Sequence, residues 1–420
     1  MKRMLIFVVL SIALTSNSSE KIKLNTPLDY GAQYGWAVSI SGDFIAVGGP
    51  GYYHEVDHTK YRCGTVLIFQ KQSNGNFTFL QRLLPPDPSV RGFFGSSLAL
   101  HKNDLIIGDD LDKMAPESIG SSDSAGAVYT YRFDEKVGKW IYVNKIVKLD
   151  RTSRDRFGKG ISLNDSIGLV TTGGKGRGEL FVIKKNYKKE WEIIRSFRDR
   201  LTTIGEIDLT GNQLIFASDI NLNLDEETRS AKWKVVTVTI DGKGHLSDFK
   251  MVKPQIAPEG RRFGKAALQI FDHYCFVTSS FKLDNGDRLS NRGNVHFFKI
   301  DSLSGEWKEI QKIISPDINK LDFFGNSMDF KDAYLVVGAL GDNYNAEDEL
   351  VEYRGGAYVY RLKTDSLIFK SKISAPEKSW NKFGFSVSTD GETALIGSRL
   401  ESYNDSIKNA GGAYIFKIEP

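Results

Sequence analysis

Short stretches in which hydrophobic and polar residues alternate recur along the whole chain. After a tight polar turn, each is followed by a second run that is almost entirely apolar. The alternating stretches include WAVSIS (36–41), SSLALH (96–101) and FSVSTD (385–390), and the apolar runs include FIAVGGP (44–50), LIIGDD (105–110) and TALIGSR (393–399). Period-two alternation, β-branched and aromatic residues, and Gly- or Asp-rich turns predict β-strands. With no convincing helical periodicity, the sequence predicts an all-β protein.

An aromatic residue followed by glycine opens each repeat of this pattern. The glycines are Gly35, Gly95, Gly158, Gly264, Gly325 and Gly384, and a degenerate member, Gly205, fills the one gap. Successive glycines lie 59–63 residues apart, except for the 47-residue step to Gly205. A later glycine is followed five residues on by a ring, in the pairs Gly64 and Phe69, Gly126 and Tyr131, Gly293 and Phe298, Gly355 and Tyr360, and Gly411 and Phe416. The spacing therefore gives seven units.

Each unit ends in one further strand-like segment, such as FTFLQRLLPPD (77–87) or WKEIQKIISPD (307–317). Four strands in each of seven units predict a seven-bladed β-propeller of four-stranded antiparallel blades. The last unit stops after its third strand. An N-terminal segment, KIKLNTPLD (21–29), matches the fourth-strand pattern. We expect this N-terminal strand to complete the last blade and close the ring.

The units resemble FG-GAP repeats, which form the blades of the integrin α-subunit head and of many secreted propellers. The resemblance covers residues 19–420. It is specific in the second, fifth, sixth and seventh units and weaker in the others, because the third is short and the fourth lacks an aromatic residue before Gly205. It implies an extracellular recognition or adhesion module. It also implies calcium sites in the turns between first and second strands. Those turns here are short and lack three alternating carboxylates, so we expect no structural calcium.

Residues 1–18 have the layout of a secretory signal peptide: Lys2 and Arg3, then an apolar run too short to span a bilayer, then small polar residues. No later stretch predicts a transmembrane segment. We therefore expect a secreted, extracellular, monomeric propeller over 19–420. If the source is eukaryotic, Asn76, Asn164 and Asn404 are glycosylation sites. Cys63 and Cys275 lie in distant blades, so we expect them not to pair.

The net charge of +4 does not favour nucleic acid as a partner. The basic run over 184–200 alternates with Tyr187, Trp191 and Phe197 and is interpreted as a half-exposed strand.

Residues 54–58, HEVDH, match the H-E-x-x-H signature of zinc proteases. That chemistry needs both histidines on one rigid helix, with a third ligand nearby. Here His54 and His58 fall in the connection between the second and third strands of the first unit. We expect a surface loop, with a loose metal contact through His54, His58 and Cys63 as a weaker alternative. We find neither a nucleophile elbow nor a phosphate loop, and predict no catalytic residues, metal or cofactor.

In a propeller the loops between second and third strands and the connections between blades emerge on one face, called here the loop face. In this chain that face carries the length variation, and variable loops on a rigid scaffold are where recognition usually occurs. The predicted ligand-binding residues are Tyr53, Asp109, Asp110, Arg154, Arg156, Arg262, Asp284, Asp287, Asp342, Tyr344 and Tyr403. They predict a basic mouth inside an acidic, aromatic rim, although salt pairing between neighbouring loops would give the same pattern.

Two function classes remain open on the sequence. The first is a non-catalytic module that binds a protein partner through the loop face. The second is a carbohydrate-binding propeller, for which one polar and aromatic set should repeat in most blades. Because the loops differ from blade to blade, a single composite protein-binding face is favoured. A hydrolase or metal enzyme is a distant third.

Overall fold

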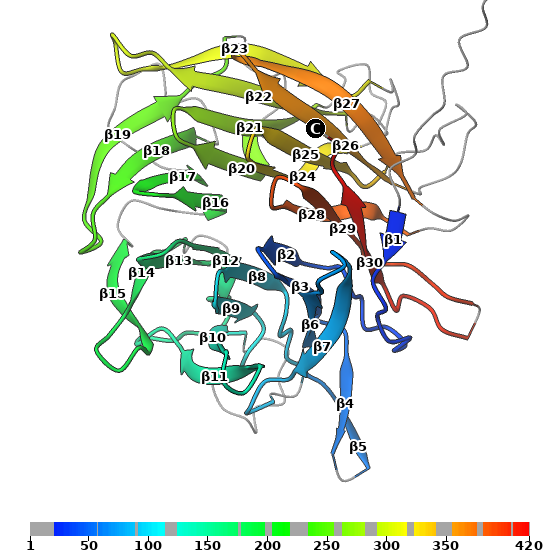
Figure 1. The fold of residues 1–420 in the computed structure, drawn as a ribbon. Coiled ribbons are helices and arrows are strands. Elements are labelled where there is room, and N and C mark those ends of the chain that lie inside the picture. The colour runs from blue at the N-terminus through cyan, green and yellow to red at the C-terminus, as the bar shows by residue number, and fades with distance from the viewer. Residues whose placement is uncertain are drawn as a thin grey trace, which may run out of the picture.

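The computed structural model describes residues 21–56, 58–88, 91–113, 124–174, 178–197, 204–218, 234–255, 263–281, 292–316, 323–341, 355–375, 381–404 and 406–419. These residues form seven four-stranded antiparallel sheets and one two-stranded sheet. The seven sheets stand as blades around a central opening, with the first strand of each blade innermost (Figure 1). No helix occurs among the residues described. The predicted all-β propeller of seven blades is confirmed.

The first four blades follow one another along the chain. Blade 1 contains β2 (Val38–Ser41), β3 (Phe44–Gly49), β6 (Thr65–Lys71) and β7 (Phe77–Leu83), and the separate hairpin β4 (Tyr53–Val56) and β5 (Thr59–Arg62) interrupts it. Blade 2 contains β8 (Ser97–His101), β9 (Asp104–Asp109), β10 (Ala127–Asp134) and β11 (Lys139–Ile146). Blade 3 contains β12 (Phe157–Leu163), β13 (Ile167–Thr172), β14 (Leu180–Lys185) and β15 (Trp191–Phe197). Blade 4 contains β16 (Ile204–Thr210), β17 (Gln213–Ser218), β18 (Lys234–Ile240) and β19 (Leu246–Val252).

The remaining blades complete the circle. Blade 5 contains β20 (Phe263–Phe271), β21 (Tyr274–Phe281), β22 (Arg292–Ile300) and β23 (Trp307–Ile314). Blade 6 contains β24 (Phe324–Lys331), β25 (Tyr334–Ala339), β26 (Gly356–Lys363) and β27 (Ser366–Ser374). Blade 7 contains β28 (Phe383–Thr389), β29 (Thr393–Ser398) and β30 (Gly412–Lys417), and its outer strand is β1 (Lys21–Lys23).

The ring closes through the N-terminal strand, as predicted. β1 pairs antiparallel with β30, with Ile22 opposite Ile415, and Leu24 donates a further backbone hydrogen bond to Ala413. The strand itself is three residues long, shorter than the predicted segment 21–29. Leu24 lies beyond it but is buried in the core between blades 7 and 1. Closure therefore rests on both backbone pairing and apolar packing.

The two glycine signatures of the sequence meet at the seams between blades. Gly64 before the third strand of blade 1 bridges to Phe94, which opens blade 2, and Gly126 bridges to Phe157 in the same way. Gly64 has a φ of +79°, and a Cβ there would lie 2.2 Å from the carbonyl oxygen of Phe94. Only glycine combines that backbone conformation with so close an approach. The repeated glycine and aromatic residues are thus those that form the contact between one blade and the next.

The ring five residues after that glycine also has a structural reason. In blades 1, 2, 5 and 6 the pairing of third and fourth strands shifts register just before this ring, for example between Ile68 and Phe69, and in blade 3 it shifts just before Ile183. Such a bulge bends a strand and re-aims its side chains. The side chains of Phe69 and Tyr131 are buried in the clusters that join neighbouring blades. Each of the seven core clusters among the described residues draws on two adjacent blades, so the core is a set of seams.

Candidate functional site

The predicted loop-face residues are placed unequally by the structure. Tyr53 on β4 and Tyr403 after β29 are 49% and 63% exposed, and Arg154 is exposed at a positive φ. These three are available to a partner. Arg262, Asp284, Asp287, Asp342 and Tyr344 lie outside the described residues. Their assignment to a binding surface stays a prediction.

Asp109 and Asp110, by contrast, are buried, and Asp110 lies at the seam between blades 2 and 3. Oδ1 of Asp109 accepts a hydrogen bond of 2.7 Å from the backbone N–H of Phe93, and burial raises the pKa of this carboxyl well above its usual range. The guanidinium of Arg156 lies 2.5 Å from Oδ2 of Asp110, and Nζ of Lys159 lies 4.0 Å from the same oxygen. The contacts of Asp110 are the salt pairing between neighbouring loops that the sequence also allowed.

More buried charges surround this seam on the same face. Lys148 is 4% exposed and pairs with both Asp155 and Glu179, at 3.2 and 3.0 Å. Arg151 contacts Asp112 at 2.7 Å. The acids and bases at this seam therefore neutralise one another, which fits a structural role better than the display of charge to a ligand.

The HEVDH segment forms part of a β-hairpin and not the loop that the sequence suggested. His54 pairs with Tyr61 across β4 and β5, while His58 lies in the turn at a φ of +61°. Two residues on a strand and a turn cannot present imidazoles one helical turn apart. Among the described residues no group of three or more His, Cys, Asp or Glu side chains could hold a metal ion, and Asp57 lies outside them. Cys63 and Cys275 are both buried and free, so the prediction that they do not pair is confirmed.

Two of the three predicted glycosylation sites are open to solvent. Asn76 and Asn404 are exposed in turns. Asn164 is partly buried, and its side-chain amide donates a 2.5 Å hydrogen bond to the carbonyl of Gly211 in blade 4. A glycan on Asn164 would have to break that bond between blades. Attachment at all three sites stays a prediction.

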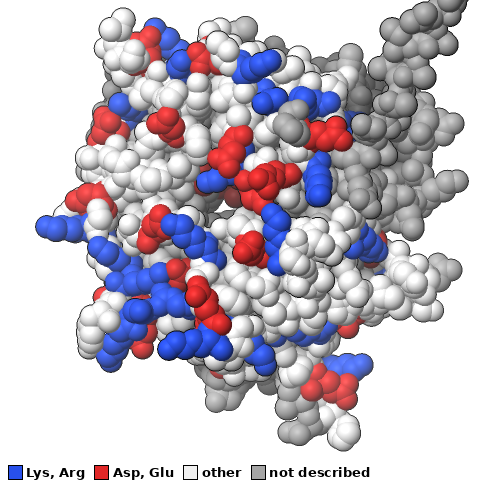
Figure 2. Space-filling view, viewed as in Figure 1, with Lys and Arg blue, Asp and Glu red and all other residues white. Residues whose placement is uncertain are grey.

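A cavity of about 960 Å³ occupies the central channel. The first strands and the short turns after them line it. These turns lie on the face opposite the loop face, and acidic side chains gather around the opening with basic ones between them (Figure 2). The carboxylates come from blades 1, 3, 4, 6 and 7, and the basic side chains include His101, Lys71 and Lys331. The sequence interpretation had assigned no role to this mouth.

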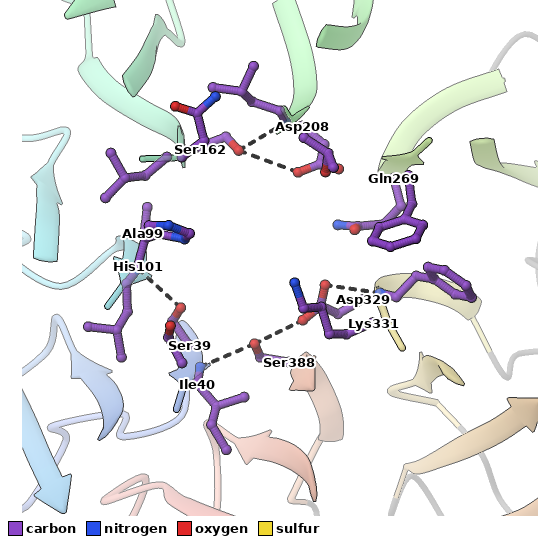
Figure 3. A pocket seen from close by; sticks show the side chains of 18 of the residues that line it. Ser39, Ile40, Ala99, His101, Ser162, Asp208, Gln269, Asp329, Lys331 and Ser388 are labelled. Carbon is purple, nitrogen blue, oxygen red and sulfur yellow. Dashed lines mark hydrogen bonds between the residues drawn. The ribbon is translucent and has the colours of Figure 1, made fainter. Parts of the chain in front are cut away.

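A layer of hydrogen bonds links the first strands around this channel (Figure 3). One position of each first strand faces the channel, namely Ser39, Ala99, Ser162, Asp208, Gln269, Asp329 and Ser388. In five cases its side-chain oxygen accepts a hydrogen bond from the backbone N–H of the next blade: Ser39 from Leu100, Ser162 from Leu209, Asp208 from Ile270, Asp329 from Thr389 and Ser388 from Ile40. The sequence signal for this layer is the small or acidic residue within each alternating stretch. The sequence alone does not show that these positions of neighbouring repeats contact one another.

Two of these residues are carboxylates in an enclosed setting. Burial raises the pKa of Asp208 to about 7, and the charge of Asp329 acts in the same direction against several hydrogen bonds. Burial also raises the pKa of Asp329. Shifted carboxyl groups in a cavity are candidates for proton transfer. Here, however, both carboxylates already bind backbone N–H groups and serine hydroxyls, with Ser162 3.3 Å from Asp208 and Ser388 3.0 Å from Asp329. Their contacts are those of groups that join blades.

The fold and these seams agree with the result of sequence comparison. Residues 307–360 and 370–416, which span most of blades 6 and 7, match the FG-GAP repeat. The chain contains FG-GAP repeats. The glycine and aromatic signatures of these FG-GAP units are those that dock at the seam between blades 6 and 7, where Gly355 bridges to Phe383. No curated protein matches the sequence.

One solved structure matches over most of this chain. The periplasmic gluconolactonase PpgL of Pseudomonas aeruginosa matches over 80% of this chain and 85% of its own, at 14% identity and a TM-score of 0.45. So low an identity and TM-score support no transfer of function.

Within the described residues there is no helix long and apolar enough to cross a membrane.

Proposed function

We propose that this protein is an exported, non-catalytic recognition module that binds a protein partner through its loop face. The observation that carries the proposal is the hairpin of β4 and β5. It projects away from blade 1 (Figure 1), and among the described residues its two strands pair only with each other. Tyr53 on this hairpin is 49% exposed. An exposed strand edge with an aromatic side chain is a surface that proteins commonly recognise.

The residues at the foot of the hairpin are held in place by contacts with blade 1. This favours a role in recognition over a loop insertion without function. The backbone N–H groups of Cys63 and Gly64 both donate to the carbonyl of Tyr52, each at 3.1 Å. The ring of Tyr52 is in turn covered by the guanidinium of Arg82, 4.4 Å from its centroid. A preorganised element loses less conformational entropy when it binds.

The channel supports this proposal less directly, because its buried polar side chains already form hydrogen bonds between blades. The buried carboxylates Asp208 and Asp329, and the hydroxyls of Ser162 and Ser388 beside them, are already engaged in hydrogen bonds between blades. The signal-peptide pattern of residues 1–18 and the loop-face tyrosines complete the argument for an exported binding module.

The test is a pair of arrays, one of extracellular proteins and one of glycans, probed with the purified propeller. Because Tyr53 pairs with Arg62, residues 54–61 can be replaced by Asn-Gly to leave a tight two-residue turn. A matched control, Val137→Ser, changes an exposed residue in the turn after β10, on the opposite face. We expect binding on the protein array that falls at least about tenfold in the shortened variant and is unchanged in the control. Binding to glycans alone, or protein binding that ignores the hairpin, would contradict the proposal.

A further inference from the structure

A cation for which the described residues supply no counter-ion lies on the loop face where blade 7 meets blade 1. Arg399 follows β29 and is partly buried. Its guanidinium carbon lies 4.5 Å from the ring centroid of Trp36 and 4.0 Å from that of Phe385. The two rings are themselves 5.4 Å apart, so they form a wedge against one side chain. Rings cover the faces of a guanidinium and leave its N–H edges free for hydrogen bonds.

No described residue accepts a hydrogen bond from those edges. Nε of Arg399 is buried without a hydrogen-bond partner, and no ion pair to this residue is found among the described residues. A buried donor left without an acceptor lowers the stability of a protein. Within the described residues, the guanidinium of Arg399 therefore lacks the carboxylate partner that Arg156 has.

A second cation adjoins the first. Ser398 and Leu400, on either side of Arg399, both donate to the carbonyl of Asn381, which fixes the next residue, Lys382, beside the guanidinium. Burial and the charge of Arg399 both lower the pKa of Lys382, and burial lowers that of Arg399. Two cations held side by side attract an anion.

The same place in another blade shows what would complete it. Asp110 follows β9 as Arg399 follows β29, and it reaches Lys159, directly after Gly158 of the next blade, as Arg399 reaches Trp36, directly after Gly35. At the seam of blades 2 and 3 the carboxylate of Asp110 meets the guanidinium of Arg156 at 2.5 Å. At the seam of blades 7 and 1 a guanidinium is present, and no described residue supplies a carboxylate to it. Among the described residues, the seam of blades 2 and 3 thus has a completed pair and the seam of blades 7 and 1 has one half of such a pair.

We propose that Arg399, assisted by Lys382, binds the carboxylate of an acidic side chain from a partner protein at the seam between blades 7 and 1. The planar guanidinium edge matches a carboxylate with two parallel hydrogen bonds. The aromatic wedge holds that edge in one orientation before binding. The identity of the partner as a protein rests on the proposed function; the carboxylate site does not.

The experiment follows the Nε–Hε resonance of Arg399 by ¹⁵N NMR while N-acetyl-glutamate methylamide is added to the full propeller. The neutral isostere N-acetyl-glutamine methylamide is the matched ligand, and glucuronate represents a carboxylate of glycan origin. We expect saturable shifts with the glutamate derivative, at an affinity on the order of millimolar for a single pair, and none with the glutamine derivative. Absence of a response to every carboxylate, or an equal response to the glutamine derivative, would overturn the site.

Variants separate this site from charge in general. Because Arg399→Gln removes the resonance that is followed, binding by the variants is measured through the indole N–H resonance of Trp36. Arg399→Gln should weaken the glutamate derivative by about tenfold or more, and Arg399→Lys should restore only part of it because the planar fork is lost. Lys382→Gln should weaken it severalfold. The control Arg156→Gln removes a paired guanidinium at the other seam and should leave the affinity unchanged. If Arg156→Gln and Arg399→Gln weaken binding equally, the inference fails.

Two further outcomes distinguish this inference from the proposed function. Tenfold tighter binding of glucuronate than of the glutamate derivative would overturn the protein partner and assign the carboxylate to a glycan. Protein-array binding that is unchanged by Arg399→Gln, with no response to the carboxylate probes, would overturn the inference and leave the recognition function standing.

Discussion

The Oγ of Ser388 lies 3.3 Å from the backbone nitrogen of Ile40 and links the last blade to the first inside the channel. The same hydroxyl donates to Oδ2 of Asp329 at 3.0 Å, so one side chain joins three blades. Ser388→Ala leaves a buried N–H without an acceptor and a buried carboxylate with one donor fewer. We expect a loss of about 1–3 kcal/mol in the free energy of unfolding, measured by urea unfolding. Ser366→Ala, at an exposed position of β27, should change it by less than about 0.5 kcal/mol. Equal effects would contradict a linking role for Ser388.

The pH dependence of stability should report Asp208. Burial raises its pKa to about 7 in the folded protein, above the value of about 4 in an unfolded chain. Between these values the folded state holds a proton that the unfolded state has released, so stability falls as pH rises from about 4 to 7. Asp208→Asn removes this dependence. From pH 4 to pH 7 the free energy of unfolding of the variant should therefore rise relative to that of the wild type. We expect a rise of about 1–2 kcal/mol, because Asp208 is only partly shielded from solvent in the channel.

Asp165→Asn is the matched control for that comparison. Asp165 is exposed, and hydrogen bonds from Lys102 and His101 lower its pKa. Its replacement should not produce a gain between pH 4 and 7. Parallel stability–pH curves for the wild type and Asp208→Asn would show that Asp208 is not shifted.

Removal of residues 20–28 should destabilise blade 7. It takes away β1, the buried side chain of Leu24 and the ion pair between Lys23 and Glu401, and it leaves β30 with an unpaired edge. We expect a loss of several kcal/mol and a lower soluble yield, measured against the chain that starts at residue 19. Lys23→Gln, which removes only the ion pair, should cost less than about 1 kcal/mol. If the deletion behaves like this point variant, closure does not depend on β1.

The two cysteines should be inert in the folded protein. Burial, followed by the charge of Asp109, raises the pKa of Cys63 to about 11, and burial raises that of Cys275 well above its usual range. Thiolates react and thiols do not. At pH 8 a colorimetric thiol reagent should therefore detect neither group in the native state and both after denaturation without reductant. Rapid reaction of either one in the native protein would contradict its burial.

The histidines of the hairpin give a simple metal test. His54→Ala combined with His58→Ala should leave the thermal midpoint unchanged, because His58 is exposed and neither side chain forms a hydrogen bond or an ion pair in the described structure. Elemental analysis of the purified protein should find no stoichiometric zinc. One zinc per chain that disappears in the double variant would restore the metal-site hypothesis.

The fold was predictable because the repeat is marked by positions, such as the seam glycines, at which few residue types fit the structure. Gly64 must be glycine because Phe94 of the next blade approaches its α-carbon, and that constraint is visible in a single sequence. The bulge before Phe69 was not predictable, since a ring at that position fits a regular strand equally well. Nor was the hairpin of β4 and β5, whose four-residue strands are too short to show a pattern.

The candidate site was less accessible to sequence reasoning. Asp110 and Arg156 looked like exposed loop charges, and only the meeting of blades 2 and 3 shows that they neutralise each other. Arg399 directly follows an apolar strand, and nothing in the sequence distinguishes it from an ordinary charge at the start of a loop. A residue that lacks a partner can be recognised only when all the groups around it are placed.

Closure by β1 also sets an order of events during synthesis. β1 leaves the ribosome first, while its partner β30 is made last, after all the other strands. During that interval blade 7 is absent and β1 has nothing to pair with. Its three-residue length and the lysines at both its ends disfavour premature pairing with other strand edges. Completion of the ring is thus the final and most non-local step of folding, and until it occurs the nascent protein is an open arc.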